Sequence, residues 1–240
     1  MEGESFFLNG ALYPLHIIKE RRRSARASFT REGLVIKLPH HLSTSETQKY
    51  LVSFKTWAEK QALKHPRLIQ PPKTHVDGSS LTVQGRTFTL RFSYQERTNS
   101  TAKVRGDEIH FYFPVGISSS LLQKHVTVLL SRTFARMYQT FLEEKVYTLN
   151  KQYFGFAFNT IRFKYNTSNW GSCSAKKNLN FSTRLLFAPE DVINYVIIHE
   201  LVHLKYLNHS SSFWSLVQAV MPDYKIKIKW LRKHGYSCDF

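Results

Sequence analysis

The stretch IIHELVHLKYLNH, residues 197–209, contains three histidines and one glutamate within a mostly apolar segment. With the apolar residues before it, it predicts a buried helix. Histidines at positions i and i+4, such as His199 and His203, stand on the same side of a helix, one turn apart. The pattern His199-Glu200-Leu201-Val202-His203 therefore fits the H-E-x-x-H zinc motif. In that motif Glu200 lies beside the metal and is the general base for a zinc-activated water.

The alternative is a core helix that carries histidines by chance, because a five-residue motif with three fixed positions recurs in many proteins. Two features favour a metal site. Glu200 would be a carboxylate at the end of a buried face, where an unpaired charge is costly unless a metal or another cation offsets it. A third histidine, His209, also follows six positions after His203.

The third ligand of such a site must come from the residues that follow, because catalytic zinc usually has three protein ligands and one open position. The sequence has no glutamate after Glu200, which argues against sites whose third ligand is a downstream glutamate. His209 has the spacing of the last histidine in H-E-x-x-H-x-x-G-x-x-H, although Tyr206 stands at the glycine position. We therefore expect the helix to continue to about Tyr206 or Leu207 and to turn at Asn208. The downstream candidates are His209, Asp223, His234, Cys238 and Asp239.

Residues 1–115 predict a β-rich region with one inserted helix. Short runs of β-branched and aromatic residues alternate with turn signals, two of which are typical of hairpins. The helix begins at an S-x-x-E capping box formed by Ser43 and Glu46 and ends near Lys64. A turn-rich linker, residues 66–78, follows it.

Residues 116–240 predict a mostly helical region with a small sheet. A periodicity of 3.6 without Gly or Pro indicates one helix over residues 119–150. Strands are expected at TIRFKYN (160–166) and LNFST (179–183), with a small-residue loop between them. The sequence Ala188-Pro189 then begins the histidine helix. A β-rich region followed by a mostly helical one predicts the α+β fold class. We expect the two regions to pack as one unit.

The composition is that of a globular protein, with 42% hydrophobic and 21% charged residues. No apolar run approaches the ~20 residues that span a bilayer, and the N-terminus does not resemble a signal peptide, so we expect no membrane partner and a cytoplasmic location. The two cysteines, Cys173 and Cys238, cannot make a disulfide framework and are expected to be free thiols in a reducing compartment.

The net charge of +17 is the unusual bulk property of the chain. Basic residues concentrate at KERRRSAR (19–26) and KIKIKWLRKH (225–234). Such a charge attracts polyanions, so nucleic acid is a candidate partner, but a solvated basic surface explains it equally well. On the second segment, four basic residues share one helical face: Lys225, Lys229, Arg232 and Lys233.

Residues 169–235 resemble the YgjP-like family of zinc metallopeptidases, which is related to the SprT-like proteases. The residues that carry the resemblance are Trp170-Gly171-Ser172-Cys173-Ser174, Arg184-Leu185, Ala188-Pro189, His199-Glu200-Leu201-x-His203, Asn208-His209-Ser210, Phe213-Trp214, Pro222-Asp223-Tyr224 and Leu231-x-x-His234-Gly235. The N-terminal half is similar in outline only: a basic, arginine-rich β-segment and then a helix with a tryptophan.

The resemblance implies a zincin-like metallopeptidase core that cleaves peptide bonds in a protein or peptide substrate. It implies zinc bound by His199, His203 and His209, with Glu200 as the catalytic base. One departure is Asn169, where the family commonly has a basic residue, so the role of that charge is open here.

Other residues of this segment have two interpretations each. Cys173 is expected to be a packing residue rather than a nucleophile or a metal ligand. Arg184 forms a structural salt bridge or supports the developing oxyanion, a role for which Tyr206 and Tyr224 are further candidates. The strand at 179–183 is expected to hold an extended peptide by β-augmentation.

Three hypotheses for the function remain at this point. The first is a zinc-dependent peptidase with a glutamate base. The second is a nucleic-acid-associated protein, including a protease that acts on DNA-bound proteins. The third is a non-catalytic module that zinc stabilises.

Overall fold

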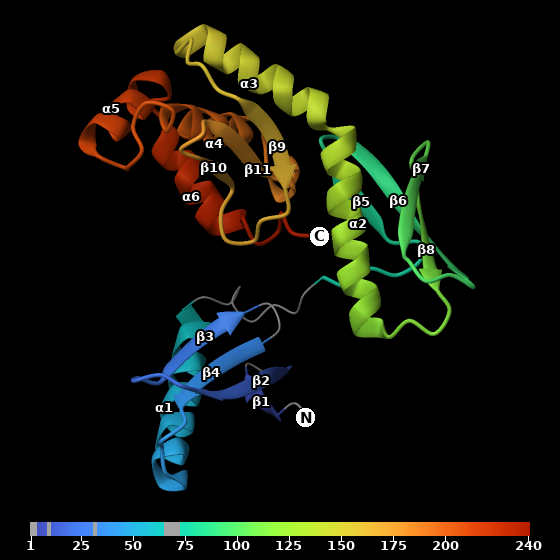
Figure 1. The fold of residues 1–240 in the computed structure, drawn as a ribbon, viewed down its shortest axis with the longest axis vertical. Coiled ribbons are helices and arrows are strands. Elements are labelled where there is room, and N and C mark those ends of the chain that lie inside the picture. Colours follow the sequence, from blue (N-terminus) through green and yellow to red (C-terminus); the bar gives the residue numbers. More distant parts are fainter. Residues whose placement is uncertain (1–3, 9–10, 31–32, 65–72) are drawn as a thin grey trace. The chain divides into compact units, whose positions relative to one another are not determined.

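The computed structural model describes residues 4–8, 11–30, 33–64 and 73–240. The chain forms two compact units, Met1–Lys73 and Thr74–Phe240, and each is described by itself (Figure 1). This division differs from the boundary expected near residue 115, because the strands before that residue share a core with the helix after it. Of the linker expected at 66–78, residues 66–72 lie outside the described residues.

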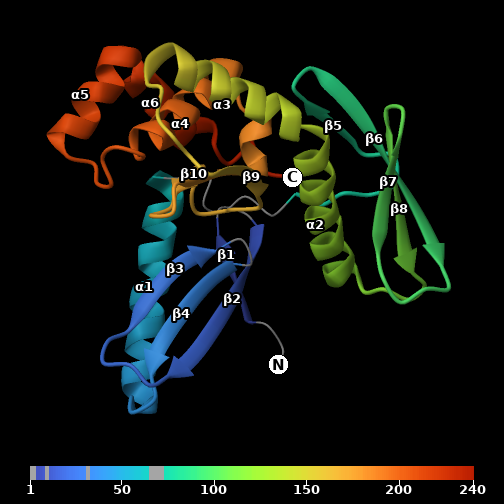
Figure 2. The ribbon, with the colours of Figure 1, turned by 45° about the horizontal axis from the view of Figure 1, so that its top comes forward.

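The first unit is a four-stranded sheet covered on one face by a helix (Figures 1 and 2). Its elements are β1 (Glu4–Leu8), β2 (Ala11–Glu20), β3 (Arg26–Thr30), β4 (Gly33–Pro39) and α1 (Thr44–Lys64). The strand order is β1-β2-β4-β3, with β2 and β4 parallel. The capping box is confirmed: the Ser43 backbone N–H donates to Glu46 Oε2 at 2.9 Å, and the Glu46 N–H donates to Ser43 Oγ at 3.2 Å.

The second unit begins with another four-stranded sheet, of order β5-β6-β8-β7. Its strands are β5 (Ser80–Val83), β6 (Arg86–Gln95), β7 (Thr101–Arg105) and β8 (Glu108–Pro114), and α2 (Ser119–Met137) packs on one face. Alternate residues of the strands are buried, as in Phe88, Phe111 and Phe113, and they meet Phe134 of α2. Both expected hairpins, β5–β6 and β7–β8, are present.

The single helix expected over 119–150 is instead two helices, α2 and α3 (Gln139–Tyr153), which meet at Tyr138. No Gly or Pro marks the break. Tyr138 has φ −107° and ψ 11°, and its hydroxyl donates to Val83 O at 3.0 Å. The change of direction lets Phe134 pack on the β5–β8 sheet while Leu142 packs in the core around the histidine helix.

The second unit continues with a three-stranded sheet and three helices. The sheet order is β10-β11-β9, from β9 (Thr160–Lys164), β10 (Gly171–Cys173) and β11 (Asn178–Ser182). A short 3-10 helix (Thr183–Phe187) leads into α4 (Glu190–Val202), α5 (Ser211–Val220) and α6 (Tyr224–His234). The strand expected at 179–183 is therefore the central strand, and β10, expected to be loop, is one of the two edge strands. The α+β class is confirmed.

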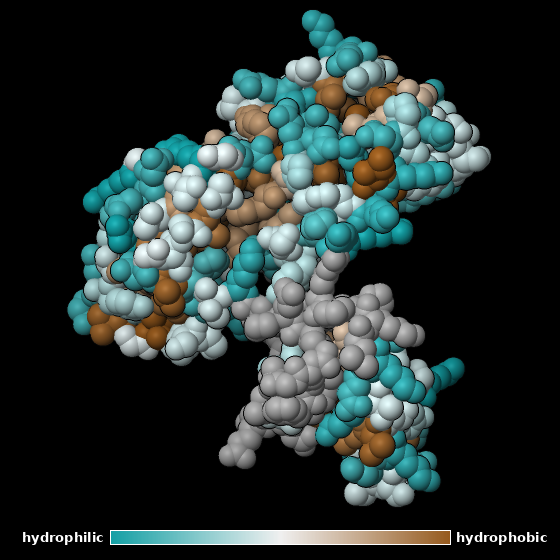
Figure 3. Space-filling model, turned by 180° about the vertical axis from the view of Figure 1, so that it is seen from behind, coloured by the Kyte–Doolittle hydropathy of each residue, from teal (hydrophilic) through white to brown (hydrophobic). Residues whose placement is uncertain are grey.

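The surface seen in Figure 3 is a mosaic of hydrophilic and hydrophobic residues. Several large apolar side chains are exposed, among them Leu121, Val128 and Tyr147. Such a distribution is ordinary, because more than half of a folded protein's surface is apolar. Among the described residues, no helix has the length and hydropathy needed to cross a membrane.

Candidate metal centre

Helix α4 brings the histidines into the core of the second unit. It contacts α3, α5, α6 and β10, and nine of its residues are buried. Glu190 and Asp191 occupy the first turn, where acids favour the helix dipole, and Asp191 accepts from Lys227 Nζ of α6 at 2.5 Å. The helix therefore starts as the sequence predicts, directly after Pro189.

The helix ends earlier than expected: at Val202, not at Tyr206 or Leu207. After His203 the backbone tightens, because the N–H of Leu204 donates to Leu201 O at 3.0 Å and that of Lys205 to Val202 O at 3.1 Å. The His203 ring also holds this turn, since its Nδ1–H donates to Tyr206 O at 2.9 Å. Ending the helix here lets the chain return towards α4 at His209.

The three predicted histidines come together in the structure. One ring nitrogen from each of His199, His203 and His209 lies within 4.8 Å of the other two. The Nε2 atoms of His199 and His209 are 3.0 Å apart. Because Nδ1 of His203 is bonded to the Tyr206 carbonyl, Nε2 is the atom that this ring presents to the cluster. A hydrogen bond of this kind fixes the tautomer and orientation of a metal-binding imidazole.

The electrostatics of the cluster suit a bound cation. Burial lowers the pKa of His199 to about 3, with smaller contributions from His203 and His209. Burial also lowers the pKa of His203; the hydrogen bond to the Tyr206 carbonyl opposes this effect, and His209 adds to it. The two rings are therefore neutral near pH 7, with lone pairs available. Three imidazole nitrogens at this spacing are a donor set that fits zinc.

Glu200 lies beside the histidines and is 4% exposed. Burial raises the pKa of its carboxyl group to about 8, and the backbone amide of Cys173 partly offsets this effect. Its Oε2 has no hydrogen-bond partner in the described part of the chain. A buried carboxylate oxygen with no partner is costly, so its presence in the pocket favours a functional role over a structural one.

Helix α5 holds His209 in place. Its first turn is capped by Ser210, whose hydroxyl accepts from the N–H of Phe213 at 3.4 Å. The buried Phe213 ring lies 4.9, 4.6 and 4.8 Å from the rings of His199, His203 and His209, measured between centroids. Trp214 stacks on His209 at 5.6 Å. Phe213 and Trp214 therefore pack this helix onto the histidine helix.

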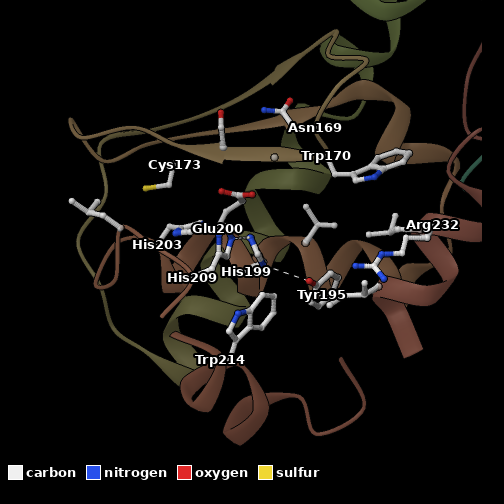
Figure 4. Close-up of a pocket in the computed structure, with 16 residues that line it drawn as sticks. Asn169, Trp170, Cys173, Tyr195, His199, Glu200, His203, His209, Trp214 and Arg232 are labelled. Carbon is white, nitrogen blue, oxygen red and sulfur yellow. Dashed lines mark hydrogen bonds between the residues drawn. The ribbon is translucent and has the colours of Figure 1, made fainter. Parts of the chain in front are cut away.

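The cluster opens into a pocket of about 640 Å³ (Figure 4). Its wall is formed by β10, α4, α5 and α6. The loop before β10 and the loop after α4 complete it. Residues that the sequence did not single out as site residues include Tyr195, whose hydroxyl lies 3.5 Å from His199 Nδ1. Burial raises the pKa of Tyr195 to about 12, Glu200 adds to this, and Arg232 opposes it. The signal for Tyr195 was its position one helical turn before His199.

Edge strand β10 forms one rim of the pocket, with Gly171, Ser172 and Cys173 in the lining. It pairs with β11 on one side only. Gly171 is packed so closely on Glu200 that a Cβ atom there would lie 2.6 Å from Glu200 Cγ. The prediction that residues 179–183 are an edge strand that holds an extended peptide is wrong, because β11 is paired on both sides. The edge strand that borders the pocket is β10.

Cys173 lines the pocket but does not join the histidine cluster. Burial raises the pKa of its thiol to about 11, and the neighbouring Glu200 carboxylate contributes. A thiol with a raised pKa is a poor nucleophile and a poor metal ligand at neutral pH. These properties favour the packing role.

The residues considered for oxyanion stabilisation do not line the histidine pocket: neither Arg184 nor Tyr206 nor Tyr224 is part of its wall. Arg184 is instead buried in a structural network. Its guanidinium donates to Thr167 O at 3.1 Å and to Gly235 O at 2.8 Å, and lies 4.6 Å from the Trp170 ring centroid. It thereby joins the C-terminal segment to the loop before β10.

Replacing Arg184 with lysine is expected to lower the stability of the second unit by about 2–3 kcal/mol, since a single ammonium nitrogen lacks the wide, planar fork that bonds both carbonyls and lies on the Trp170 ring. The melting temperature in a thermal denaturation measurement checks this. The control is Arg91→Lys, whose exposed ion pair with Glu108 should leave the melting temperature nearly unchanged. Equal effects of the two substitutions would contradict the buried network.

The chain was compared with family models, curated proteins and solved structures. The model described as YgjP-like, metallopeptidase domain, matches residues 23–234. No curated protein gives a match. Among solved structures, the chain is similar to the metallopeptidase zymogen of Pyrococcus abyssi abylysin, with 26% identity and a TM-score of 0.35 over 38% of this chain and 93% of that one. It is also similar to the zymogen of Methanocaldococcus jannaschii jannalysin, with 22% identity and a TM-score of 0.31 over 37% and 93%. Because the family model spans most of the sequence, including the histidine stretch, the chain belongs to the YgjP-like metallopeptidase family.

Proposed function

We propose that this metal-dependent peptidase uses zinc held by His199, His203 and His209, with Glu200 as the general base. The observation that carries the proposal is the convergence of three imidazole nitrogens within 4.8 Å of one another. A buried carboxylate lies beside them, and both open into one pocket. A core helix with incidental histidines needs no such convergence.

The chain's own residues have distinct tasks in this reaction. When bound, zinc supplies a Lewis acid that polarises the scissile carbonyl and makes water more acidic. Glu200 accepts a proton from the attacking water at its carboxylate and passes it to the amine that leaves. Tyr206, through its carbonyl, and Phe213, through its ring, hold the imidazoles in position. Burial of Glu200 keeps bulk water from competing for that proton.

The substrate is proposed to bind as an extended strand along β10. An edge strand offers unpaired backbone N–H and C=O groups, and a peptide can satisfy them by adding one more strand. Because β10 lies at the rim of the pocket, a peptide paired with it would pass over Glu200 and the histidines.

Metal analysis combined with hydrolysis tests the proposal. The purified protein is expected to bind one zinc ion per chain and to cleave an unfolded protein substrate. Removal of zinc with a chelator should abolish cleavage, and added zinc should restore it. Hydrolysis that is equal with and without chelator would contradict a zinc enzyme. Zinc binding without any hydrolysis, and a melting temperature that falls when zinc is removed, would support the non-catalytic module instead.

We also propose a cytoplasmic location, supported by the two free cysteines, Cys173 and Cys238. Nucleic acid as a partner of the basic surface stays a prediction. Its check is affinity for a DNA oligonucleotide at low salt, which should fall steeply as salt increases.

A further inference from the structure

The histidine pocket does not end at the catalytic groups. From the cluster its wall continues past Tyr195 to Arg232 (Figure 4). A second pocket, of about 460 Å³, adjoins the first, because both are lined by Trp214, Ile228 and Arg232. The remaining lining residues of the second pocket are Tyr224, Lys225 and Lys229. The two pockets therefore lead from the proposed metal ligands to a basic face of α6.

The charges along this path are separated. In the first pocket, Glu200 is the one acidic residue and Arg232 the one lysine or arginine among the described residues that form the wall. The second pocket is lined by three cations and no acid. These cations, Lys225, Lys229 and Arg232, are all exposed and stand on one side of the helix at positions i, i+4 and i+7.

The opposite side of α6 is neutralised within the protein. Lys227 forms ion pairs with Asp191 at 2.5 Å and with Asp223 at 3.0 Å. In the part of the chain that the structure describes, neither Lys225 nor Lys229 forms such a pair. Asp191 and Asp223 thus pair with Lys227, on the side that packs on α4, whereas Lys225 and Lys229 add positive charge to the wall of the second pocket.

The wall between the histidines and the cations is aromatic. The rings of His209 and Trp214 stack at 5.6 Å and 22°, and those of Trp214 and Tyr224 at 5.3 Å and 20°. Lys225 Nζ lies 5.9 Å from the Tyr224 ring centroid. A ligand group suited to this path has an apolar stem that can lie on the rings and an anionic end that can reach a guanidinium.

We propose that Arg232, supported by Lys225 and Lys229, selects peptide substrates that carry a carboxylate close to the scissile bond. The inference rests on the proposed peptidase function and names its substrate class. A guanidinium can bind a carboxylate through two parallel N–H···O hydrogen bonds, which lysine cannot do. The carboxylate is that of a glutamate or aspartate side chain, or the C-terminal carboxylate of the substrate.

A peptide fits this recess better than a nucleic acid does. Nucleic acids are bound through many phosphate contacts spread along a backbone. Here the three cations lie within about two turns of one helix, at the end of a pocket that begins at the proposed metal ligands. One or two carboxylates of a bound peptide are sufficient to match them.

Matched peptides test this selectivity. In a peptide that the zinc-loaded protein cleaves, each position flanking the cleavage site is made glutamate in one version and its neutral isostere, glutamine, in the other. At one position we expect glutamate to raise kcat/KM by about tenfold, the size of one charged hydrogen-bonded contact. Arg232→Glu should abolish this preference or reverse it in favour of lysine. Peptides with a free or amidated C-terminus next to the cleavage site separate the two sources of the carboxylate.

The matched control is Lys233→Glu, which makes the same change of charge at the next position of α6 but lies outside both pockets. It should retain the preference. The inference is overturned if the wild-type protein cleaves both versions equally, or if Lys233→Glu changes the preference as much as Arg232→Glu. It is also overturned if Arg232→Glu weakens binding of a DNA oligonucleotide while peptide selectivity is unchanged. A protein that binds no zinc and cleaves no peptide refutes the proposed function itself, and the inference with it.

Discussion

Replacing Glu200 with glutamine is expected to lower kcat for peptide hydrolysis by about 10²- to 10⁴-fold, the range of a lost general base. Glutamine keeps the size and shape of the side chain and can still accept from the backbone amide of Cys173, but it cannot take a proton from water. Steady-state kinetics with the zinc-loaded protein measure the loss. Bound zinc should remain at one per chain, because Glu200 is not part of the histidine cluster.

The fold of this variant should be intact, since glutamine has the size of the glutamate side chain and places no charge in the buried site. The melting temperature is therefore expected to be unchanged or higher. Glu190→Gln is a suitable control: it is the same substitution at the exposed start of the same helix, and it should leave kcat unchanged. Equal hydrolysis by wild type and Glu200→Gln would refute the assigned base. Loss of zinc together with activity would make Glu200 a metal ligand instead.

The centre of this site could be predicted from sequence because its signals are local. His199 and His203 are one helical turn apart, and because no glutamate follows Glu200 in the sequence, His209 is a candidate third ligand. The spacing between His203 and His209 predicts that the chain returns to the metal site, but it does not predict where the helix ends. The helix ends at Val202 because the His203 ring bonds the Tyr206 carbonyl and the last turn tightens. That is a side-chain contact, and helix periodicity carries no information about it.

The parts that were not predicted depend on contacts between distant segments. The break at Tyr138 has no Gly or Pro, and it occurs because Phe134 and Leu142 belong to different hydrophobic cores. Strand β10 has three residues, too few for a periodic pattern, and only its pairing with β11 makes it an edge. Arg184 has its role because Gly235, 51 positions later, offers a carbonyl to it.

Replacing Gly171 with alanine is expected to lower kcat/KM by about 10²-fold, although residue 171 carries no reactive group. A Cβ atom at this position would lie 2.6 Å from Glu200 Cγ and 2.7 Å from Glu200 Oε1, closer than nonbonded atoms can approach. Either the Glu200 side chain or β10 must move. A displacement of about 1 Å in a catalytic group costs on the order of 10²-fold in rate. Zinc content should be unchanged, because no histidine is touched.

A glycine outside the pocket distinguishes a loss of activity from a loss of stability. Gly106, in the β7–β8 hairpin, has φ +56° and nothing within 4 Å of its Cβ position. Gly106→Ala should therefore lower the melting temperature through backbone strain and retain the hydrolysis rate. Gly171 is not in the left-handed region. Gly171→Ala should therefore lower the hydrolysis rate and cause no loss of melting temperature from backbone strain.

The double variant Gly171→Ala/Glu200→Gln decides whether Gly171 acts through Glu200. If alanine at 171 lowers the hydrolysis rate by displacing the Glu200 carboxylate, then it should lower the rate little further in a protein that already lacks this carboxylate. The double variant should therefore be about as active as Glu200→Gln alone, a non-additivity typical of residues that act as one unit. Additive losses would mean that Gly171 affects the reaction by another route, such as the pairing of a peptide with β10. A small residue in the Trp170-Gly171-Ser172-Cys173 segment would then serve the substrate rather than the base.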